Sequence, residues 1–403
     1  MTDEATPPGN LDTALERELQ DGSAARIERR AVNAHLIGQP GSRARLNTPA
    51  LLIDVDAMSR NLARMAERCA SAGVALRPHA KTHKSAHIAR LQLAAGAAGI
   101  CVAKPGEAEA LAADGIRRLL ITSPIAGEDA IRRFVALHAH TDDLILAVDH
   151  PAILDRLEAA ARQAGIRVSF VVDIDVGLKR TGTNDPEAAL HMAKRGVDSA
   201  ALQYRGIQAY GGHLQHIGGR AARHEATAGA MRGAQAIVER LRAEGLAPEL
   251  VTGGGTGTHR ADIEQSFLND IQAGSYPFMD SQYHHALADE DGGGFETALR
   301  VQTTIISINA PEWVTVDGGT KSFATDGPAP EPLSPRFAGA DYLFMGDEHG
   351  VVMRGDKEPE PGERVEFAAP HCDPTVNLYD FYHLVRGGTL VGIWPVTARG
   401  ASF

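Results

Sequence analysis

The sequence predicts an α/β fold, a (β/α)8 barrel followed by a mostly β domain, on three observations. Short apolar or β-branched runs alternate with amphipathic helical patterns over about 250 residues, the usual length of one such barrel. After about residue 294 the helical patterns stop, and strand-like runs separated by turns continue. Glycines stand where helices of the first region should end, at Gly73, Gly115, Gly165 and Gly245. A doubly wound open sheet is the alternative for the alternating region.

The chain divides into three predicted parts, at 1–46, 47–293 and 294–403. The first is a polar N-terminal extension punctuated by glycine and proline, with a helical pattern over 11–19. The second contains strand-like runs at 50–55, 75–79, 99–103, 119–122, 144–148, 168–174, 206–210 and 249–252. A helical pattern follows each run except the last, which a glycine loop follows. In the third part the strand-like runs are 298–308, 313–316, 342–345, 364–367 and 390–394.

The composition disfavours several classes of partner. A formal net charge of −11 over 403 residues argues against binding to a phosphate backbone, and 5% aromatic residues leave few side chains on which bases could stack. No apolar run reaches the roughly 20 residues of a membrane span. Cys69, Cys101 and Cys372 show neither a disulfide framework nor paired zinc spacing, which favours a reducing compartment. We therefore expect a cytoplasmic protein with no nucleic-acid or membrane partner.

A lysine after the second strand-like run is the first candidate catalytic residue. An apolar approach over 74–76 delivers Lys81 to the end of a strand that should be buried. Complete burial disfavours the ammonium form and can lower a lysine pKa by ~3–5 units, leaving an amine that forms an imine with a carbonyl. His79 and other basic neighbours add positive potential that acts in the same direction. Taken alone, residues 76–84 fit a basic turn with a solvated lysine better, but residues after the other strands reverse this interpretation.

Polar residues follow several other predicted strands. Arg180 follows the sixth run, and Tyr210 and His216 follow the seventh. In a barrel these positions converge on the mouth formed by the carboxyl ends of the strands, where active sites lie. Arg180 could be a surface cation that caps a helix; in the mouth it could instead hydrogen-bond a phenolic oxygen of a cofactor, and we favour the second interpretation.

The glycine run after the eighth strand can hold a phosphate. Backbone N–H groups of Gly254, Gly255, Thr256 and Gly257 can close around the anion, and this is where barrels commonly bind one. The hydroxyl groups of Ser275 and Tyr276 could add donors. A lone glycine loop is a weak signal, and the absence of a Lys-Ser/Thr ending disfavours ATP. A phosphate anchor and a buried amine in one mouth together predict a pyridoxal 5′-phosphate site, which neither predicts alone.

A second constellation lies in the predicted β domain. His371 and Asp373 should project to the same side of an extended segment, as alternate residues do. An imidazole and a carboxylate so placed can hold a divalent metal ion, with water or substrate at the remaining positions. The spacing alone fits a plain loop, with an aspartate turn before proline, better. Two ligands are too few to name the metal.

Together these residues resemble the fold-type III pyridoxal-phosphate enzymes of the D-threonine aldolase and D-serine dehydratase family. The resemblance implies an alanine-racemase-like barrel, a C-terminal β domain and a homodimer with a metal ion beside the cofactor. It makes Lys81 the Schiff-base lysine and Gly254–Gly257 the phosphate site, with Arg180 and Tyr210 in contact with the cofactor ring. We also expect His79 to bind the cofactor. The similarity runs from about residue 48 to 400 and is carried by 78–81, 173–182, 208–210, 215–216, 252–257, 272–280, 347–351, 371–377 and 394–400.

Within this family the metal motif separates two activities. Dehydratases carry His-x-Cys, which places a thiolate on zinc, whereas aldolases carry His-x-Asp, a harder site suited to manganese or magnesium. The chain has His371 and Asp373, with Cys372 between them and pointing away, so Mn²⁺ or Mg²⁺ is favoured and Zn²⁺ is the alternative. Two positions depart from the family pattern: Ala103 stands where a glutamine is expected, and Gly211-Gly212 follows Tyr210.

The sequence therefore predicts a carbon–carbon lyase that cleaves a β-hydroxy-D-amino acid to glycine and an aldehyde. D-threonine, D-phenylserine and 3-hydroxy-D-aspartate are candidate substrates. His216 or a water on the metal ion would remove the β-hydroxyl proton. The alternatives are a D-serine or 3-hydroxyaspartate dehydratase, in which Lys81 takes the α-proton, a non-catalytic pyridoxal-phosphate carrier and a racemase. His371 and Asp373 weigh against the carrier, which needs no β domain.

Overall fold

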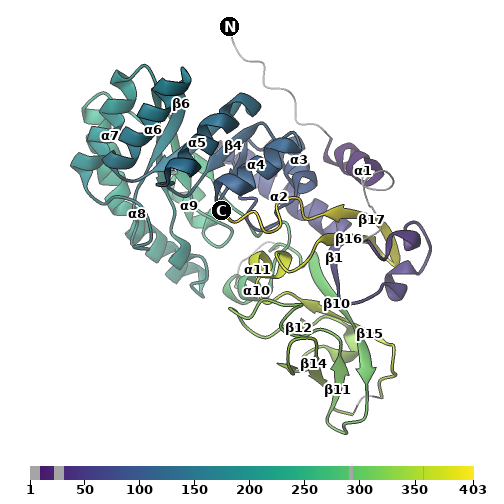
Figure 1. Cartoon of the computed structure of the whole chain (residues 1–403). Coiled ribbons are helices and arrows are strands. Elements are labelled where there is room, and N and C mark those ends of the chain that lie inside the picture. Colours follow the sequence, from purple (N-terminus) through teal and green to yellow (C-terminus); the bar gives the residue numbers. More distant parts are fainter. Residues whose placement is uncertain (1–9, 22–30, 290–293, 357) are drawn as a thin grey trace. The chain divides into compact units, whose positions relative to one another are not determined.

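The computed structural model describes residues 10–21, 31–289, 294–356 and 358–403, in two compact units (Figure 1). The barrel unit comprises Ala66–Lys81, Gly96–Gly274 and Gly400–Phe403. The β unit comprises Met1–Met65, Thr82–Ala95 and Ser275–Arg399. Each unit is thus drawn from several stretches of chain, and the boundaries at residues 46 and 293 stay a prediction.

The barrel unit is a ring of parallel strands. The strands pair in the order β2-β9-β8-β7-β6-β5-β4-β3. A parallel bridge between His79 and Cys101 joins the two ends, and hydrogen bonds from Ala80 N to Cys101 O (2.7 Å) and from Cys101 N to Pro78 O (2.8 Å) reinforce it. The predicted barrel class is therefore confirmed. The strands are β2 (Ala75–Leu76), β3 (Ile100–Val102), β4 (Arg118–Ile121), β5 (Asp143–Val148), β6 (Val168–Asp173), β7 (Leu202–Ala209), β8 (Leu250–Gly253) and β9 (Asp270–Ile271).

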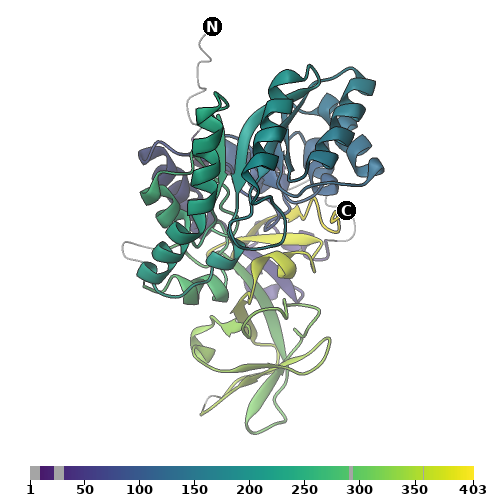
Figure 2. The same cartoon turned by 90° about the vertical axis from the view of Figure 1, so that its left-hand side faces the viewer.

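Helices lie on the outer side of these strands (Figures 1 and 2). They are α4 (Pro105–Ala113), α5 (Glu128–Leu137), α6 (Pro151–Ala164), α7 (Pro186–Asp198), α8 (Arg220–Ala243) and α9 (His259–Gln265), with 3-10 turns η3 (His138–His140) and η4 (Gly212–Leu214). Proline occupies the first position of α4, α6 and α7, where its missing N–H costs nothing. Gly165 ends α6 at φ 68°, a left-handed conformation that glycine adopts without steric cost.

The β unit is built on a second sheet. Its main path is β13-β14-β11-β10-β1-β16-β17, and β15 pairs with β10 and β12. The strands are β1 (Ala50–Asp54), β10 (Leu299–Ser307), β11 (Trp313–Val316), β12 (Glu331–Pro332), β13 (Tyr342–Phe344), β14 (Gly350–Met353), β15 (Arg364–Ala368), β16 (Phe381–Arg386) and β17 (Thr389–Pro395). The helices of this unit are α1 (Leu11–Asp21), α3 (Ala86–Ala94), α10 (Ser281–Ala286) and α11 (Cys372–Val376), with 3-10 turns η1 (Ala34–Leu36), η2 (Ser42–Arg45) and η5 (Pro335–Phe337). The division between the units falls within α2 (Val55–Ser71).

The strand expected to open the barrel belongs to this second sheet. β1 pairs antiparallel with β10 and parallel with β16, and the two-residue β9 completes the barrel instead. The prediction was wrong because an apolar run announces a buried strand but does not say which sheet it joins.

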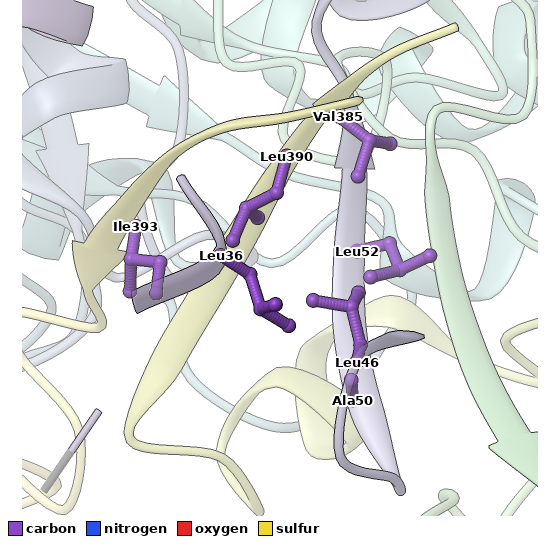
Figure 3. Close-up of a cluster of buried hydrophobic side chains, with 7 residues drawn as sticks. All are labelled: Leu36, Leu46, Ala50, Leu52, Val385, Leu390 and Ile393. Carbon is purple, nitrogen blue, oxygen red and sulfur yellow. The ribbon is translucent and has the colours of Figure 1, made fainter. Parts of the chain in front are cut away.

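A buried apolar cluster anchors the N-terminal extension to this sheet. Leu36 and Leu46, which precede β1, pack with residues of β1, β16 and β17, and Figure 3 shows the side chains converging. Full burial of a leucine or valine side chain stabilises a fold by about 1.5–3 kcal/mol. The described part of the extension is thus part of the β unit's core. The cluster is Leu36, Leu46, Ala50, Leu52, Val385, Leu390 and Ile393.

Within the stretches that the structure describes, none of the helices combines the length and apolar character needed to cross a membrane.

Candidate active site

A cavity of about 340 Å³ opens at the carboxyl ends of the barrel strands. Residues that end or follow β2, β3, β4, β6, β7 and β9 line it. Four predicted site residues meet here, and they are His79, Lys81, Arg180 and Tyr210. The remaining lining residues are Ala103, Thr122, Ser123, Thr181, Gln208 and Gln272. Cavities of about 460 and 420 Å³ lie between outer helices of the same unit, and their linings contain no lysine.

The segment that carries Lys81 is held from both sides. Hydrogen bonds from Arg77 N to Ile271 O (2.9 Å) and from His79 N to Ala273 O (3.0 Å) continue the pairing with β9, and the bridge to Cys101 lies on the other side. Pro78 needs no donor partner, because it has no N–H. Lys81 itself is half-buried, which is less than the complete burial assumed for the strongest desolvation.

His79 is fixed in one tautomer beside the lysine. Its Nδ1 accepts a hydrogen bond from the backbone N–H of Lys81 at 3.2 Å, so Nε2 carries the proton and donates to Thr122 Oγ1 at 3.0 Å. Thr122 in turn donates to Val102 O at 3.2 Å. The imidazole therefore orients the Lys81 turn.

A loop after β6 delivers Arg180 to the cavity. Asp173, at the end of β6, accepts hydrogen bonds from Thr181 Oγ1 (2.8 Å, at Oδ2) and from Thr183 N (2.9 Å, at the backbone oxygen). The guanidinium carbon of exposed Arg180 lies 5.7 Å from the centroid of the Tyr210 ring, within the range of a cation–π interaction. These hydrogen bonds hold the base of the loop to the end of β6, and Arg180 and Tyr210 face each other.

A chain of buried polar side chains runs beneath the cavity. Gln208 Nε2 donates to Asp173 Oδ1 (2.8 Å), and Gln272 Nε2 donates to Gln208 Oε1 (3.2 Å) and to Thr252 Oγ1 (3.0 Å). Thr252 Oγ1 then donates to Asp270 Oδ1 at 2.5 Å. Satisfied networks of this kind fix side-chain positions. Burial raises the pKa of Asp173 to about 6, while its hydrogen bonds to Gln208 and Thr181 oppose the shift.

The glycine loop, Gly253–Gly257, follows β8. In the strand order β2-β9-β8 it emerges two strands away from the Lys81 segment, roughly 10 Å at the usual strand spacing, and at the same end of the sheet. Gln215 supports it: Oε1 accepts from Gly257 N (3.0 Å), and Nε2 donates to Thr258 Oγ1 (3.0 Å). A Cβ atom at position 257 would collide with the backbone oxygen of Gln215, so the packing requires glycine there.

These features fit a pyridoxal phosphate group. The cavity offers an amine and an aromatic–guanidinium pair, and the loop offers backbone N–H groups, most of them from glycines. Of the predicted phosphate contacts, Gly257 N already donates to Gln215. Ser275 and Tyr276 are buried residues of the β unit, where the hydroxyl of Tyr276 accepts from Gln92 Nε2 at 3.2 Å.

His216, the predicted base, is not among the residues that line the cavity. It is exposed in the segment between η4 and α8.

The predicted metal pair lies at the start of α11 in the β unit. His371 precedes the helix and Asp373 is in its first turn, with His371 Nε2 3.7 Å from Asp373 Oδ2. The expected extended segment is therefore wrong: Asp373 and Pro374 are typical of a first helical turn, and the helix starts here. Cys372 is buried and its thiol donates to Met279 O at 3.5 Å.

Neighbouring carboxylates arrange this pair. Asp326 Oδ2 lies 2.9 Å from His371 Nδ1, so Nδ1 donates and the lone pair of Nε2 is left for a metal ion. Asp280 Oδ2 accepts from Cys372 N at 2.8 Å and fixes the start of the helix. Among the described residues no group of three or more His, Cys, Asp or Glu side chains is arranged to hold a metal ion. The donor set fits a two-ligand site completed by water or substrate.

Sequence reasoning missed several of these groups. Thr122, Ser123 and Gln272 line the cavity, and Asp326 orients His371. The first three follow strands directly, so the rule that identified Tyr210 would also have found them. Asp326 is distant in sequence from its partner and carries no local signal.

A parallel-strand barrel with an amine and a glycine loop at the carboxyl ends of its strands, together with a β unit, defines the class of pyridoxal-phosphate enzymes with the alanine racemase fold. Residues 53–282 match the family described as the N-terminal domain of alanine racemase, and residues 298–385 match the putative serine dehydratase domain. The chain belongs to the family that contains D-threonine aldolase and 3-hydroxy-D-aspartate aldolase.

Curated relatives match nearly the whole chain. It is 37% identical over 369 residues to D-threonine aldolase of Arthrobacter sp, covering 90% of this chain and 96% of the relative. It is 35% identical over 373 residues to 3-hydroxy-D-aspartate aldolase of Paracoccus denitrificans (strain Pd 1222), covering 90% and 95%. The crystal structure of D-threonine aldolase from Filomicrobium marinum superposes with a TM-score of 0.85 at 34% identity, covering 89% of this chain and 97% of that one.

Proposed function

We propose that this protein cleaves β-hydroxy-D-amino acids to glycine and an aldehyde, using pyridoxal 5′-phosphate and a divalent metal ion. The observation that carries the proposal is one cavity at the carboxyl ends of the barrel strands, which Lys81, Arg180 and Tyr210 line together. The names of the two aldolase relatives support the reaction type.

Different residues bind different parts of the cofactor. When bound, the cofactor supplies an aldehyde that condenses with amines and a conjugated ring that delocalises the electron pair released by bond cleavage. Lys81 provides the amine that holds it, and His79 keeps the turn of Lys81 in place. Arg180 and Tyr210 contact the ring, and the backbone of Gly254–Gly257 holds the phosphate.

The β-hydroxyl group of the substrate must lose its proton for the Cα–Cβ bond to break. His371 and Asp373 would hold a metal ion, Mn²⁺ or Mg²⁺ in preference to Zn²⁺, which supplies Lewis acidity to that hydroxyl. His216 or a water molecule at the ion would accept the proton; His216 is exposed and lies outside the lining of the cavity. Breaking the bond releases the aldehyde, and a proton added at Cα gives glycine.

We further propose a cytoplasmic homodimer. Three buried cysteines that form no disulfide, Cys69, Cys101 and Cys372, suit a reducing compartment. The dimer follows from the family resemblance, and light scattering on the purified protein measures it directly.

Incubation with D-threonine tests the function. We expect glycine and acetaldehyde in equal amounts, formed only with D-threonine and not with L-threonine, and lost on adding a chelator and restored by Mn²⁺. Formation of 2-oxobutyrate and ammonia would instead identify a dehydratase. Absence of metal-dependent turnover on D-threonine, D-phenylserine and 3-hydroxy-D-aspartate would reject both activities and favour a carrier protein.

A further inference from the structure

An acid that the proposed reaction does not use is buried against the glycine loop. Asp262 lies in α9 and is 2% exposed. A Cβ atom at position 254 would lie 2.4 Å from Asp262 Oδ2, and Gly254 has φ 68°. The loop therefore rests directly on the carboxyl group, and only glycine permits this approach.

The carboxyl group shares its hydrogen bonds with the loop. Asp262 Oδ2 accepts from Thr258 Oγ1 at 2.6 Å, and the backbone N–H of Gly255 also donates to the carboxyl group. Thr258 Oγ1 accepts a hydrogen bond from Gln215 Nε2, so the hydroxyl proton of Thr258 is donated to Asp262. Among the described residues, the other oxygen, Oδ1, is buried without a hydrogen-bond partner. A buried carboxylate oxygen without a partner is costly when charged and much less so when protonated.

In the part of the chain that the structure describes, no positively charged side chain acts on the pKa of Asp262. The neighbouring His259 is buried, and burial lowers its pKa to about 3. Its Nδ1–H donates to Thr256 O at 2.8 Å and its Nε2 accepts from Arg68 Nη1 at 3.0 Å, so the ring is neutral. Arg68 of α2, Arg260 of α9 and Arg223 of α8 act on His259.

We propose that Asp262 is a positioning residue for the anion site, and that its carboxyl group must be protonated for the glycine loop to bind a phosphate dianion. An ionised Asp262 would place a negative charge against the loop and compete for the Gly255 N–H. The neutral acid keeps the hydrogen bond from Thr258, is a weaker acceptor for the Gly255 N–H and removes the repulsion. This inference rests on the proposed placement of the cofactor phosphate in the loop.

The electrostatics of the site support this assignment. Burial raises the pKa of Asp262 to about 7, and the hydrogen bonds from Thr258 and Gly255 oppose the shift. If only the protonated form binds the phosphate, affinity is constant below that pKa and weakens by about tenfold per pH unit above it.

Asp262→Asn provides the test, because asparagine copies the shape of the neutral acid and does not titrate. The dissociation constant of pyridoxal 5′-phosphate is measured by equilibrium dialysis from pH 6 to 9 for the full chain freed of cofactor, wild type and variant. Ionisation of Lys81 and of the cofactor affects both proteins alike and cancels in the ratio. We expect the ratio of wild-type to variant constants to rise roughly 100-fold between pH 6 and 9, of which about 50-fold falls between pH 7 and 9. Parallel curves would overturn the proposal, since a merely structural role shifts affinity equally at every pH.

Pyridoxal, which lacks the phosphate, distinguishes an error in the placement of the phosphate from an error in the role of Asp262. We expect its ratio to stay constant with pH. If wild type binds pyridoxal and pyridoxal 5′-phosphate equally well, the placement of the phosphate is wrong and the inference fails with it. If the phosphate strengthens binding but the ratio stays flat, only the role of Asp262 is wrong.

A second variant covers the case in which Asp262→Asn does not fold. Thr258→Val removes a hydrogen bond that lowers the pKa of Asp262. The pH above which the affinity for pyridoxal 5′-phosphate weakens should therefore be higher in this variant than in the wild type. An unchanged or lower break point would contradict the proposal.

Discussion

The two candidate sites are held in place by different means. In the barrel unit, the cavity rests on a buried chain of hydrogen bonds, and the segments that carry Lys81 and Arg180 are fastened to strands. In the β unit, the metal pair stands at the start of a five-residue helix, and the histidine is oriented by exposed Asp326. The fold itself fixes the first site, whereas the second gains its geometry from a few side chains.

Replacement of Lys81 should have the largest effect. Lys81→Ala removes the amine from the cavity of the barrel unit, and turnover on D-threonine should fall by about three orders of magnitude or more. The visible absorbance of the imine should vanish as well. Lys104→Ala is the matched control, because the exposed side chain of Lys104 donates to the backbone oxygen of Ser402 and does not line the cavity. An active Lys81→Ala protein with unchanged absorbance would contradict its role.

The buried chain beneath the cavity should show in the pH dependence of stability. Because burial raises the pKa of Asp173 from 3.8 to about 6, its stabilising contribution is complete below pH 3.8 and is lost as the pH rises through 6. The whole loss should be about 3 kcal/mol, of which about 2 kcal/mol falls between pH 4.5 and 8, and Asp173→Asn should abolish it. Urea unfolding at pH values between about 4.5 and 8 measures the difference between the two proteins. A constant difference would show that Asp173 does not titrate in this range.

In the β unit, a buried histidine should make stability depend on pH in the opposite direction. His383 donates from Nδ1 to Leu51 O (3.2 Å) and accepts at Nε2 from Asn33 Nδ2 (3.0 Å), and burial lowers its pKa to about 4. Its contribution is present above the ordinary pKa of 6.5 and is lost as the pH falls through 4. His383→Gln should therefore reduce the loss of stability in acid, in the same unfolding series. Equal acid sensitivity of the variant and the wild type would argue against a neutral His383.

The weaker support of the metal pair should appear as lost metal affinity. Asp326→Ala removes the acceptor that directs His371 Nε2 to the ion, and Mn²⁺ affinity should fall about 10- to 100-fold. Titration followed by electron paramagnetic resonance measures this without turnover. Asp356→Ala, at an exposed position of the same unit, should bind Mn²⁺ like the wild type. If both variants bind equally well, Asp326 does not orient the ligand.

Two glycines of the barrel helices should give the smallest effects, with opposite signs. Gly165→Ala forces alanine into a left-handed conformation and should destabilise the fold by about 1 kcal/mol. Gly233 lies within α8, where an added Cβ meets nothing within 4 Å, so Gly233→Ala should stabilise by about 0.5–1 kcal/mol. Urea unfolding of the two variants provides the comparison. Equal signs would mean that backbone conformation is not what distinguishes these positions.

The sequence predicted most where function follows strand ends. Lys81, Arg180 and Tyr210 were identified because each lies just beyond an apolar run, and parallel strands bring such positions to one cavity. β9 was missed because two residues give no periodic signal. α9 was missed because it is short and follows the glycine loop directly in the sequence. The burial of Asp262 could not be predicted, since it depends on packing between the loop and a helix that had not been recognised. The start of α11 was misjudged because five residues fit a turn or a helix equally well.

The position of β1 in its sheet constrains the order in which this protein can fold during synthesis. Residues 50–54 leave the ribosome early, but their neighbours in the sheet, β10 and β16, lie about 250 and 330 residues further along. Until those strands are made, β1 is an apolar segment with two unpaired edges, which is prone to aggregation. Pairings of such separation also slow folding. The nascent chain should therefore need a chaperone until translation is nearly complete.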